Sequence, residues 1–189
     1  MQGKIEIRWH GRGGQGAVTA AKILAEAALS AGKFIQAFPE FGPERAGAPV
    51  RSFNRISDNS IKSHSQITNP DVVVVLDATL LGTINVCEGL KDGGLVIINT
   101  SKTPTEIKKA NNIKAKVATV DATDIAVREF KRNIPNTPMI AALVKTTDIL
   151  PLDVVLKGFK EQFSGKFSPE VVEANLRAMK EAFDKVKVE

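Results

Sequence analysis

The fold is decided by residues 10–19, which read HGRGGQGAVT. Before them, residues 4–9 alternate apolar and polar side chains with a period of two, which is typical of a β-strand. After them, residues 18–31 are rich in Ala, Leu and Ile at helical spacing. The stretch therefore predicts a strand, a glycine-rich turn and a helix.

The turn fits the pattern G-x-G-x-x-G with Gly11, Gly13 and Gly16. In such a turn the backbone approaches a pyrophosphate, and the N-terminus of the helix directs free N–H groups and a partial positive charge at it. The third glycine, Gly16, is expected to let the helix pack closely on the strand. The sequence predicts an anion site here. The alternative is a tight turn that binds nothing.

A NAD-binding unit also needs an acidic residue about twenty positions further on, at the end of the second strand. That position falls near residues 36–38, which contain no acid, and Glu40 is separated from the predicted strand by Pro39. A fourth glycine, Gly14, loosens the turn further. The pattern thus favours phosphate binding over NAD binding.

Length and composition exclude several classes of protein. With 189 residues, 43% of them hydrophobic and 25% charged, the chain is long enough for one globular domain with a substantial core. It has no run of eighteen apolar residues and no signal-peptide core at its start, so we expect a cytoplasmic protein that does not bind membranes. One cysteine, Cys87, excludes an internal disulfide framework, a cluster held by four cysteines and a zinc finger.

The net charge of +5 is compatible with nucleic acid, an acidic partner or a polyanionic cofactor. In the second half, however, lysines are interleaved with acidic residues, as on a solvated helix face. No basic tract is studded with aromatic residues, so we do not expect nucleic-acid binding. His10 and His64 are too far apart in sequence for a metal motif and are interpreted as structural or surface residues, so no metal site is predicted.

A second unusual stretch spans residues 39–49, PEFGPERAGAP. Three prolines and two glycines in eleven residues exclude a regular helix and predict an exposed loop of defined shape. The adjacent Glu44 and Arg45 in such a stiff loop favour a functional role over that of a simple connector.

The rest of the first 134 residues alternates strands and helices. Strands are expected at 33–38, 50–57, 72–76, 95–99 and 115–120, a short extended piece at 61–67, and helices at 80–90, 105–110 and 122–130. The strand at 50–57 is too polar to be expected in the centre of a sheet, with Arg51, Phe53 and Arg55 on one face. Asp77 and Asn99 follow buried strands, where ligands of parallel sheets gather, although ordinary turn residues also occupy such positions.

From residue 136 onward only helices are expected, at 136–146, 152–163 and 169–186, with Ser168 as N-cap of the last. The prediction is an α/β fold: a doubly wound, mostly parallel, Rossmann-like sheet with a C-terminal helical extension. We expect residues 1–189 to form a single domain, with an α/β core over 1–134 and helices over 135–189.

The chain resembles the gamma subunits of 2-oxoacid:ferredoxin oxidoreductases, most closely those of the pyruvate enzymes, over nearly its whole length. The resemblance rests on GRGGQG at 11–16, FGPERxG at 41–47, the NPD at 69–71 that leads into an apolar strand, and PNTP at 135–138. One departure lies at 46–48, which read Ala-Gly-Ala where the family often has Arg-Gly-Gly. If that basic residue contacts a ligand in the family, this chain lacks the contact.

The resemblance implies a subunit of an assembly that decarboxylates a 2-oxoacid oxidatively with thiamine diphosphate, reduces ferredoxin through iron–sulfur clusters, and transfers the acyl group to coenzyme A. Partner alpha, beta and delta subunits would hold the thiamine diphosphate and the clusters, so that no catalytic residue is expected here and the isolated chain should be inactive. The implied coenzyme A contacts are the glycine loop and its neighbours in the second loop: Gly11, Arg12, Gly13, Gly14, Gln15, Gly16, Ala17, Glu44, Arg45 and Gly47.

Two alternatives of other classes remain at the level of sequence. One is an independent NAD- or flavin-linked oxidoreductase, and the other is a purely architectural subunit whose glycine turn only packs against a neighbour. The sequence does not distinguish pyruvate from other 2-oxoacids, or the direction of the reaction.

Overall fold

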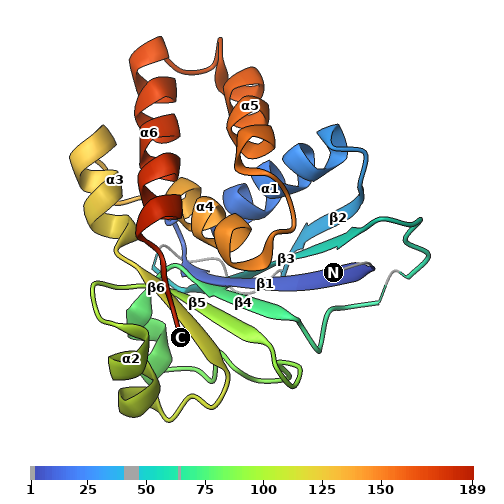
Figure 1. The fold of residues 1–189 in the computed structure, drawn as a ribbon, viewed down its shortest axis with the longest axis vertical. Helices are drawn as coiled ribbons and strands as arrows, with labels where there is room; N and C mark the ends of the chain where they lie inside the picture. The colour runs from blue at the N-terminus through green and yellow to red at the C-terminus, as the bar shows by residue number, and fades with distance from the viewer. Residues whose placement is uncertain (1–2, 41–46, 64) are drawn as a thin grey trace.

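The computed structural model describes residues 3–40, 47–63 and 65–189, and within them a seven-stranded sheet runs through the molecule (Figure 1). Its strands lie in the order β2-β3-β1-β4-β5-β6-β7. Their bounds are β1 Lys4–Arg12, β2 Phe34–Pro39, β3 Pro49–Ser57, β4 Val72–Val75, β5 Leu95–Asn99, β6 Lys116–Val120 and β7 Lys187–Val188. The α/β fold class predicted from the sequence is confirmed.

The centre of the sheet is parallel and its flanks are antiparallel. β1, β4, β5 and β6 run in the same direction, whereas β3 pairs antiparallel with both β1 and β2, and β7 pairs antiparallel with β6. β3 therefore separates β1 from β2, which are neighbours in the dinucleotide-binding order. The connection through the first helix skips one strand position.

Most helices cover one face of the sheet. They are α1 Ala17–Ser30, α3 Ala122–Phe130, α4 Asn136–Thr147, α5 Leu152–Phe163 and α6 Pro169–Lys185. Figure 1 shows α1, α4, α5 and α6 above the sheet. They enclose the larger core, which includes Ile7 and Trp9 of β1, Leu24 of α1 and Met139 of α4. The helix bounds agree with the sequence prediction to within one or two residues.

The opposite face is covered mainly by loops. Among the described residues, the only regular elements on this face are the 3-10 helix η1 Ala78–Gly82 and the helix α2 Pro104–Asn111. Figure 1 shows α2 below the sheet. A smaller core forms here from residues of β4, β5 and β6 and from residues of the cover: Val73, Val75, Leu80, Val86, Val96, Ile98, Ile107, Ile113 and Val117.

Three expectations differ from the structure. The helix predicted at 80–90 is wrong, because only η1 forms and the chain then turns, with Gly89 at a φ of +68°. β3 lies second from the edge of the sheet, in agreement with the expectation that so polar a strand is not central, and its polar side chains find partners inside the fold: Asn54 donates to the Ala21 carbonyl oxygen over 2.8 Å. The described residues between 60 and 68 form no strand, and β7, which was not expected, ends the chain.

Candidate functional site

The glycine loop lies at the end of β1 and is held by its own side chains. The Gln15 side chain accepts a hydrogen bond from the Arg12 N–H over 2.8 Å and donates one to Asp77 Oδ2 over 2.8 Å. The Arg12 guanidinium reaches the same Asp77 oxygen over 3.2 Å and Thr79 Oγ1 over 2.9 Å. Asp77, two residues after the end of β4, thus ties the loop to the neighbouring strand.

The surroundings of Asp77 favour its ionised form. Burial opposes ionisation, but hydrogen bonds from Thr79 and Gln15, together with the charge of Arg12, outweigh burial and lower the pKa of the carboxyl below its usual value. The carboxylate also caps η1 by accepting the Thr79 N–H over 2.9 Å. Its role seen here is to position the loop.

Gly11 and Gly16 each lie where a side chain would meet neighbouring atoms, but the neighbours differ. A Cβ on Gly11 would lie 3.2 Å from Leu76 and 3.3 Å from Ala17, so this residue allows the helix to approach the strand. Gly16 has a φ of +82°, and a Cβ there would lie 2.7 Å from Asn136 Nδ2. The expectation that Gly16 serves helix–strand packing is therefore wrong: Gly11 does so, while Gly16 makes room for the first residue of α4.

The described end of the second loop meets the first. The Gly13 N–H donates to the Ala48 carbonyl oxygen over 3.0 Å, and Arg12 Nη1 donates to the Gly47 carbonyl oxygen over 3.1 Å. These contacts exist because β3, which follows the second loop, pairs with β1 along its whole length. Glu44 and Arg45 lie outside the described residues.

The N-terminus of α1 has free backbone donors beside the glycine loop. Its first hydrogen bond runs from Ala20 N to the Gly16 carbonyl oxygen, so the N–H groups of residues 17–19 have no acceptor within the helix. No side chain caps this end, and the first turn contains no acid. Uncapped N–H groups and the helix dipole suit a phosphate or another anion.

Asn99 and the start of α3 lie beside this edge and serve the structure. The Asn99 amide donates to the Leu76 carbonyl oxygen over 2.8 Å and to Thr123 Oγ1 over 2.8 Å, and its oxygen accepts the Thr123 N–H. Its interpretation as an ordinary turn residue is consistent with these bonds. Within the described ranges, no group of three or more His, Cys, Asp or Glu side chains is placed to hold a metal ion.

A row of buried polar side chains on β1 was not foreseen. Arg8 is 4% exposed and donates from Nε to His10 Nε2 over 3.0 Å, and from Nη2 to the Val86 and Glu88 carbonyl oxygens over 3.0 and 2.6 Å. Because His10 accepts at Nε2, its proton is assigned to Nδ1. Burial, with the positive charges of Arg8 and Arg51, lowers the pKa of His10 to about 3. The alternating sequence marked these residues as one face, but not that the face is buried.

No helix in the described part of the chain is both long and apolar enough to cross a membrane. The fold and this edge define an α/β domain in which two loops and an uncapped helix N-terminus converge beside parallel strand ends.

Residues 6–185 match the family model described as pyruvate ferredoxin/flavodoxin oxidoreductase. The chain is 52% identical over 183 residues to pyruvate synthase subunit PorC of Thermotoga maritima, covering 97% of this chain and 95% of that one. The crystal structure of the PORC subunit from that organism superposes with a TM-score of 0.87 at 48% identity, covering 100% and 99% of the two chains.

Two further relatives extend the comparison. The common gamma subunit of the pyruvate/ketoisovalerate oxidoreductases of Thermococcus litoralis is 52% identical over 185 residues, covering 97% of this chain and 98% of that one. A 2-oxoglutarate:ferredoxin oxidoreductase from Magnetococcus marinus, solved with 2-oxoglutarate, coenzyme A and succinyl-CoA, shares the fold with a TM-score of 0.76 at 19% identity, over 96% of this chain and 31% of that one. The chain belongs to the pyruvate ferredoxin/flavodoxin oxidoreductase family, as its gamma-type subunit.

Proposed function

We propose that this chain docks coenzyme A at the edge formed by its glycine loop and the second loop, within an assembled pyruvate:ferredoxin oxidoreductase. The observation that carries the proposal is the pair of hydrogen bonds from Arg12 and Gly13 to Gly47 and Ala48, which unite the two loops beside the N-terminus of α1. Coenzyme A carries a pyrophosphate and a ribose phosphate, which uncapped helix N–H groups can bind without a ribose-binding acid. A related oxidoreductase of the same fold was solved with coenzyme A.

The proposed contacts are Gly11, Arg12, Gly13, Gly14, Gln15, Gly16, Ala17, Glu44, Arg45 and Gly47. Their roles differ. Backbone N–H groups at the start of α1 would bind phosphate, whereas Arg12 would add charge at the rim. Because Arg12 shares Asp77 with Gln15 in this structure, a bound phosphate would compete with Asp77 for the guanidinium.

Gly16→Ala tests the site. The added Cβ meets Asn136 and imposes a side chain on a backbone with positive φ, so the start of α1 must shift. In the assembled enzyme we expect the apparent affinity for coenzyme A to fall by about tenfold or more, because several charge-assisted hydrogen bonds are misaligned together. Coenzyme-independent decarboxylation of pyruvate should be largely retained.

Gly32→Ala is the matched control. Gly32 has a φ of +76°, lies beyond the other end of α1 and has no atom within 4 Å of an added Cβ, so it reproduces the backbone strain alone. Equal coenzyme A affinities in the two variants, both folded and assembled, would leave the glycine loop as a packing element and favour the architectural alternative.

An independent NAD-linked oxidoreductase is less well supported. β2 is separated from β1 by β3, and Glu40, the acid nearest the ribose position, forms an ion pair with Arg51 over 2.5 Å. Addition of NAD to the isolated chain with a 2-oxoacid and a dye should give no reduction.

The remaining functions are proposed for the assembly. Alpha, beta and delta subunits would bring thiamine diphosphate and iron–sulfur clusters, and ferredoxin would accept the electrons, with this single-domain chain inactive alone and the complex cytoplasmic. Dye reduction by the purified chain with pyruvate and coenzyme A, in the absence of partners, would refute this division of labour.

A further inference from the structure

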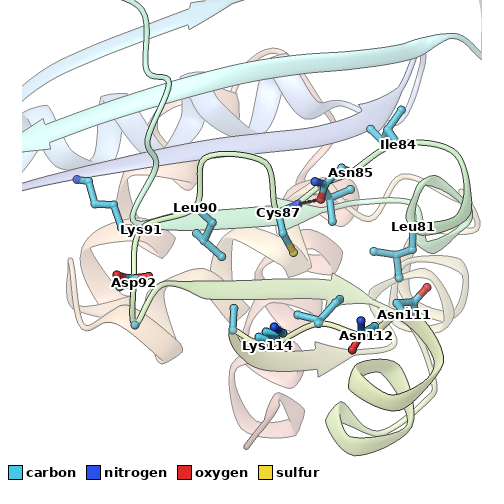
Figure 2. A pocket seen from close by; sticks show the side chains of 14 residues that line it. Leu81, Ile84, Asn85, Cys87, Leu90, Lys91, Asp92, Asn111, Asn112 and Lys114 are labelled. Atoms are coloured by element: carbon cyan, nitrogen blue, oxygen red, sulfur yellow. Dashed lines mark hydrogen bonds between the residues drawn. The ribbon is translucent and has the colours of Figure 1, made fainter.

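A pocket of about 410 Å³ lies on the loop-covered face of the sheet, away from the glycine loop. It opens between residues 81–93, which lead from η1 to β5, and residues 111–115, which lead from α2 to β6 (Figure 2). Its size falls within the range of small-molecule sites, about 300–1,000 Å³. No residue of the glycine loop or of residues 47–49 lines it.

The floor of the pocket is apolar. Val86 and Ile113 are buried members of the smaller core, and Leu81, Ile84 and Leu90 are half-buried against that core while also lining the pocket. These branched side chains form a concave apolar surface that remains open to water. An apolar body of matching size would complete their burial.

The rim supplies hydrogen-bond donors and a cation. Asn85 uses its oxygen to accept the Cys87 N–H over 3.1 Å, which leaves its amide N–H groups to donate outward. Lys114 is exposed and forms no ion pair with the described residues, whereas Lys91 contacts Asp71 and Glu6. Asn112 adds a second exposed amide.

One acid, Asp92, also lies on the rim. Figure 2 shows it next to Lys91 and away from Lys114, so the two sides of the opening differ in charge. The side that carries Lys114 and Asn112 presents a positive charge and an amide donor, a set that matches a carboxylate.

We propose that this pocket binds a small carboxylic acid with a branched aliphatic or aromatic body, with the body on Leu81, Ile84 and Leu90 and the carboxylate at Lys114 and the neighbouring amides. This site is separate from the proposed coenzyme A edge, and its test does not depend on that edge.

Cys87 provides a local readout, because it lines the pocket and is the only cysteine of the chain. Figure 2 shows its sulfur directed into the space between residues 81–93, to which it belongs, and residues 111–115. The rate at which a thiol reagent modifies the full chain is measured while 4-methylpentanoate is titrated. We expect the rate to fall by about tenfold at saturation, because the bound acid removes the thiol from solvent. Methyl NMR shifts of Ile84 and Ile113 give a readout that does not require the thiol to react.

Two controls define the ligand class. The neutral 4-methylpentanamide should protect at a concentration about fivefold higher than the acid, and Lys114→Gln should raise the half-protecting concentration of the acid by a similar factor, as expected for a solvent-exposed ion pair. Lys166→Gln, a substitution in the turn between α5 and α6, should change nothing.

The same titration on the assembled enzyme completes the test, with protection of Cys87 by the acid as the expected result. Absence of both protection and methyl shifts overturns the proposal, and equal binding of acid and amide overturns the carboxylate assignment. A Cys87 that is unreactive in the complex before any acid is added, with Ile84 and Ile113 shifts unchanged by it, shows that a partner subunit covers the pocket and also overturns the proposal.

Discussion

The two faces of the sheet are stabilised in different ways. On the face covered by α1, α4, α5 and α6, β1 presents Ile5, Ile7 and Trp9 to a continuous apolar core. On the other face the same strand presents Glu6, Arg8 and His10, which are all less than 9% exposed and are covered by loops. Apolar burial is the main stabilising term on the first face, and paired polar groups are needed on the second.

The difference shows how a strand with strict alternation can be buried on both faces. Arg8 reaches the carbonyl oxygens of Val86 and Glu88, and Arg55 reaches those of Ser63 and Ser65, so the guanidinium groups take the place of the backbone partners that the irregular cover lacks. A long, multivalent donor can hold a loop where an apolar side chain could only pack against it. The larger of the two pockets described, about 410 Å³, lies on the loop-covered face, whereas one of about 160 Å³ lies beside Ile5 and the end of α4.

The largest expected effect tests whether charge pairing matters as much as apolar burial. Glu6 accepts from Arg55 Nε over 2.7 Å, and Arg55 is 1% exposed. Glu6→Ala leaves that guanidinium buried without its carboxylate, so the free energy of unfolding should fall by about 3–5 kcal/mol. Leu24→Ala, the matched deletion on the helix-covered face, should cost about 2–5 kcal/mol. Urea denaturation of both variants measures the comparison.

Glu6→Gln is the control, because it retains an acceptor of similar shape without the charge. It should be less destabilising than Glu6→Ala. A Glu6→Ala protein as stable as the wild type would mean that carbonyl oxygens alone satisfy Arg55.

The second prediction uses pH to distinguish the faces. His10 has a pKa of about 3 in the folded chain, against 6.5 as its ordinary value. Below pH 6.5 the unfolded chain therefore binds a proton that the folded chain does not, and stability is lost as the pH falls toward 3. Between pH 7 and pH 5 the loss should be about 2 kcal/mol. The lowered pKa values of Glu6 and Asp77 act at lower pH, where their carboxylates begin to protonate.

His10→Gln in a His64→Gln background should abolish this slope, because Gln can still accept from Arg8 but does not titrate. Urea unfolding at a series of pH values, with His64→Gln alone as the reference, provides the measurement. If the two proteins share the same pH dependence, His10 is protonated in the folded state and the loop-covered face is more hydrated than these contacts indicate.

Elements that pack through apolar side chains were predicted well from the sequence, whereas a segment held by a distant polar side chain was not. Helices α4, α5 and α6 and strands β4, β5 and β6 were predicted nearly to their bounds, because apolar spacing reports which side of an element meets the core. The segment 80–90 was predicted as a helix and is not one, since Arg8, some 80 residues earlier, binds the Val86 and Glu88 carbonyl oxygens. Local periodicity cannot reveal such a partner.

In the candidate site, too, the local motif could be predicted and the long-range contacts could not. The glycine loop and its helix could be predicted because turn, strand and helix signals are contiguous. The contacts from Arg12 to Asp77 and Gly47 could not be predicted, because they depend on β3 and β4 flanking β1. The need for a glycine at residue 16 beside Asn136 could not be predicted either, because it depends on α4 meeting the start of α1.

The smallest expected effect concerns how helices on the two faces are fixed. α2, on the loop-covered face, buries only Pro104 and Ile107 and begins with a capping box in which Thr103 accepts the Glu106 N–H over 3.3 Å and Glu106 accepts the Thr103 N–H over 2.7 Å. α6, on the other face, buries seven of its residues and has no side-chain cap at Ser168. A helix with little buried surface depends more on its cap, so Thr103→Ala should lower the free energy of unfolding by about 1 kcal/mol, whereas Ser168→Ala should change it by only about 0.3 kcal/mol. Hydrogen exchange of the α2 amides, measured beside urea unfolding, locates the loss, and a larger effect at Ser168 than at Thr103 would show that packing does not compensate for a missing cap.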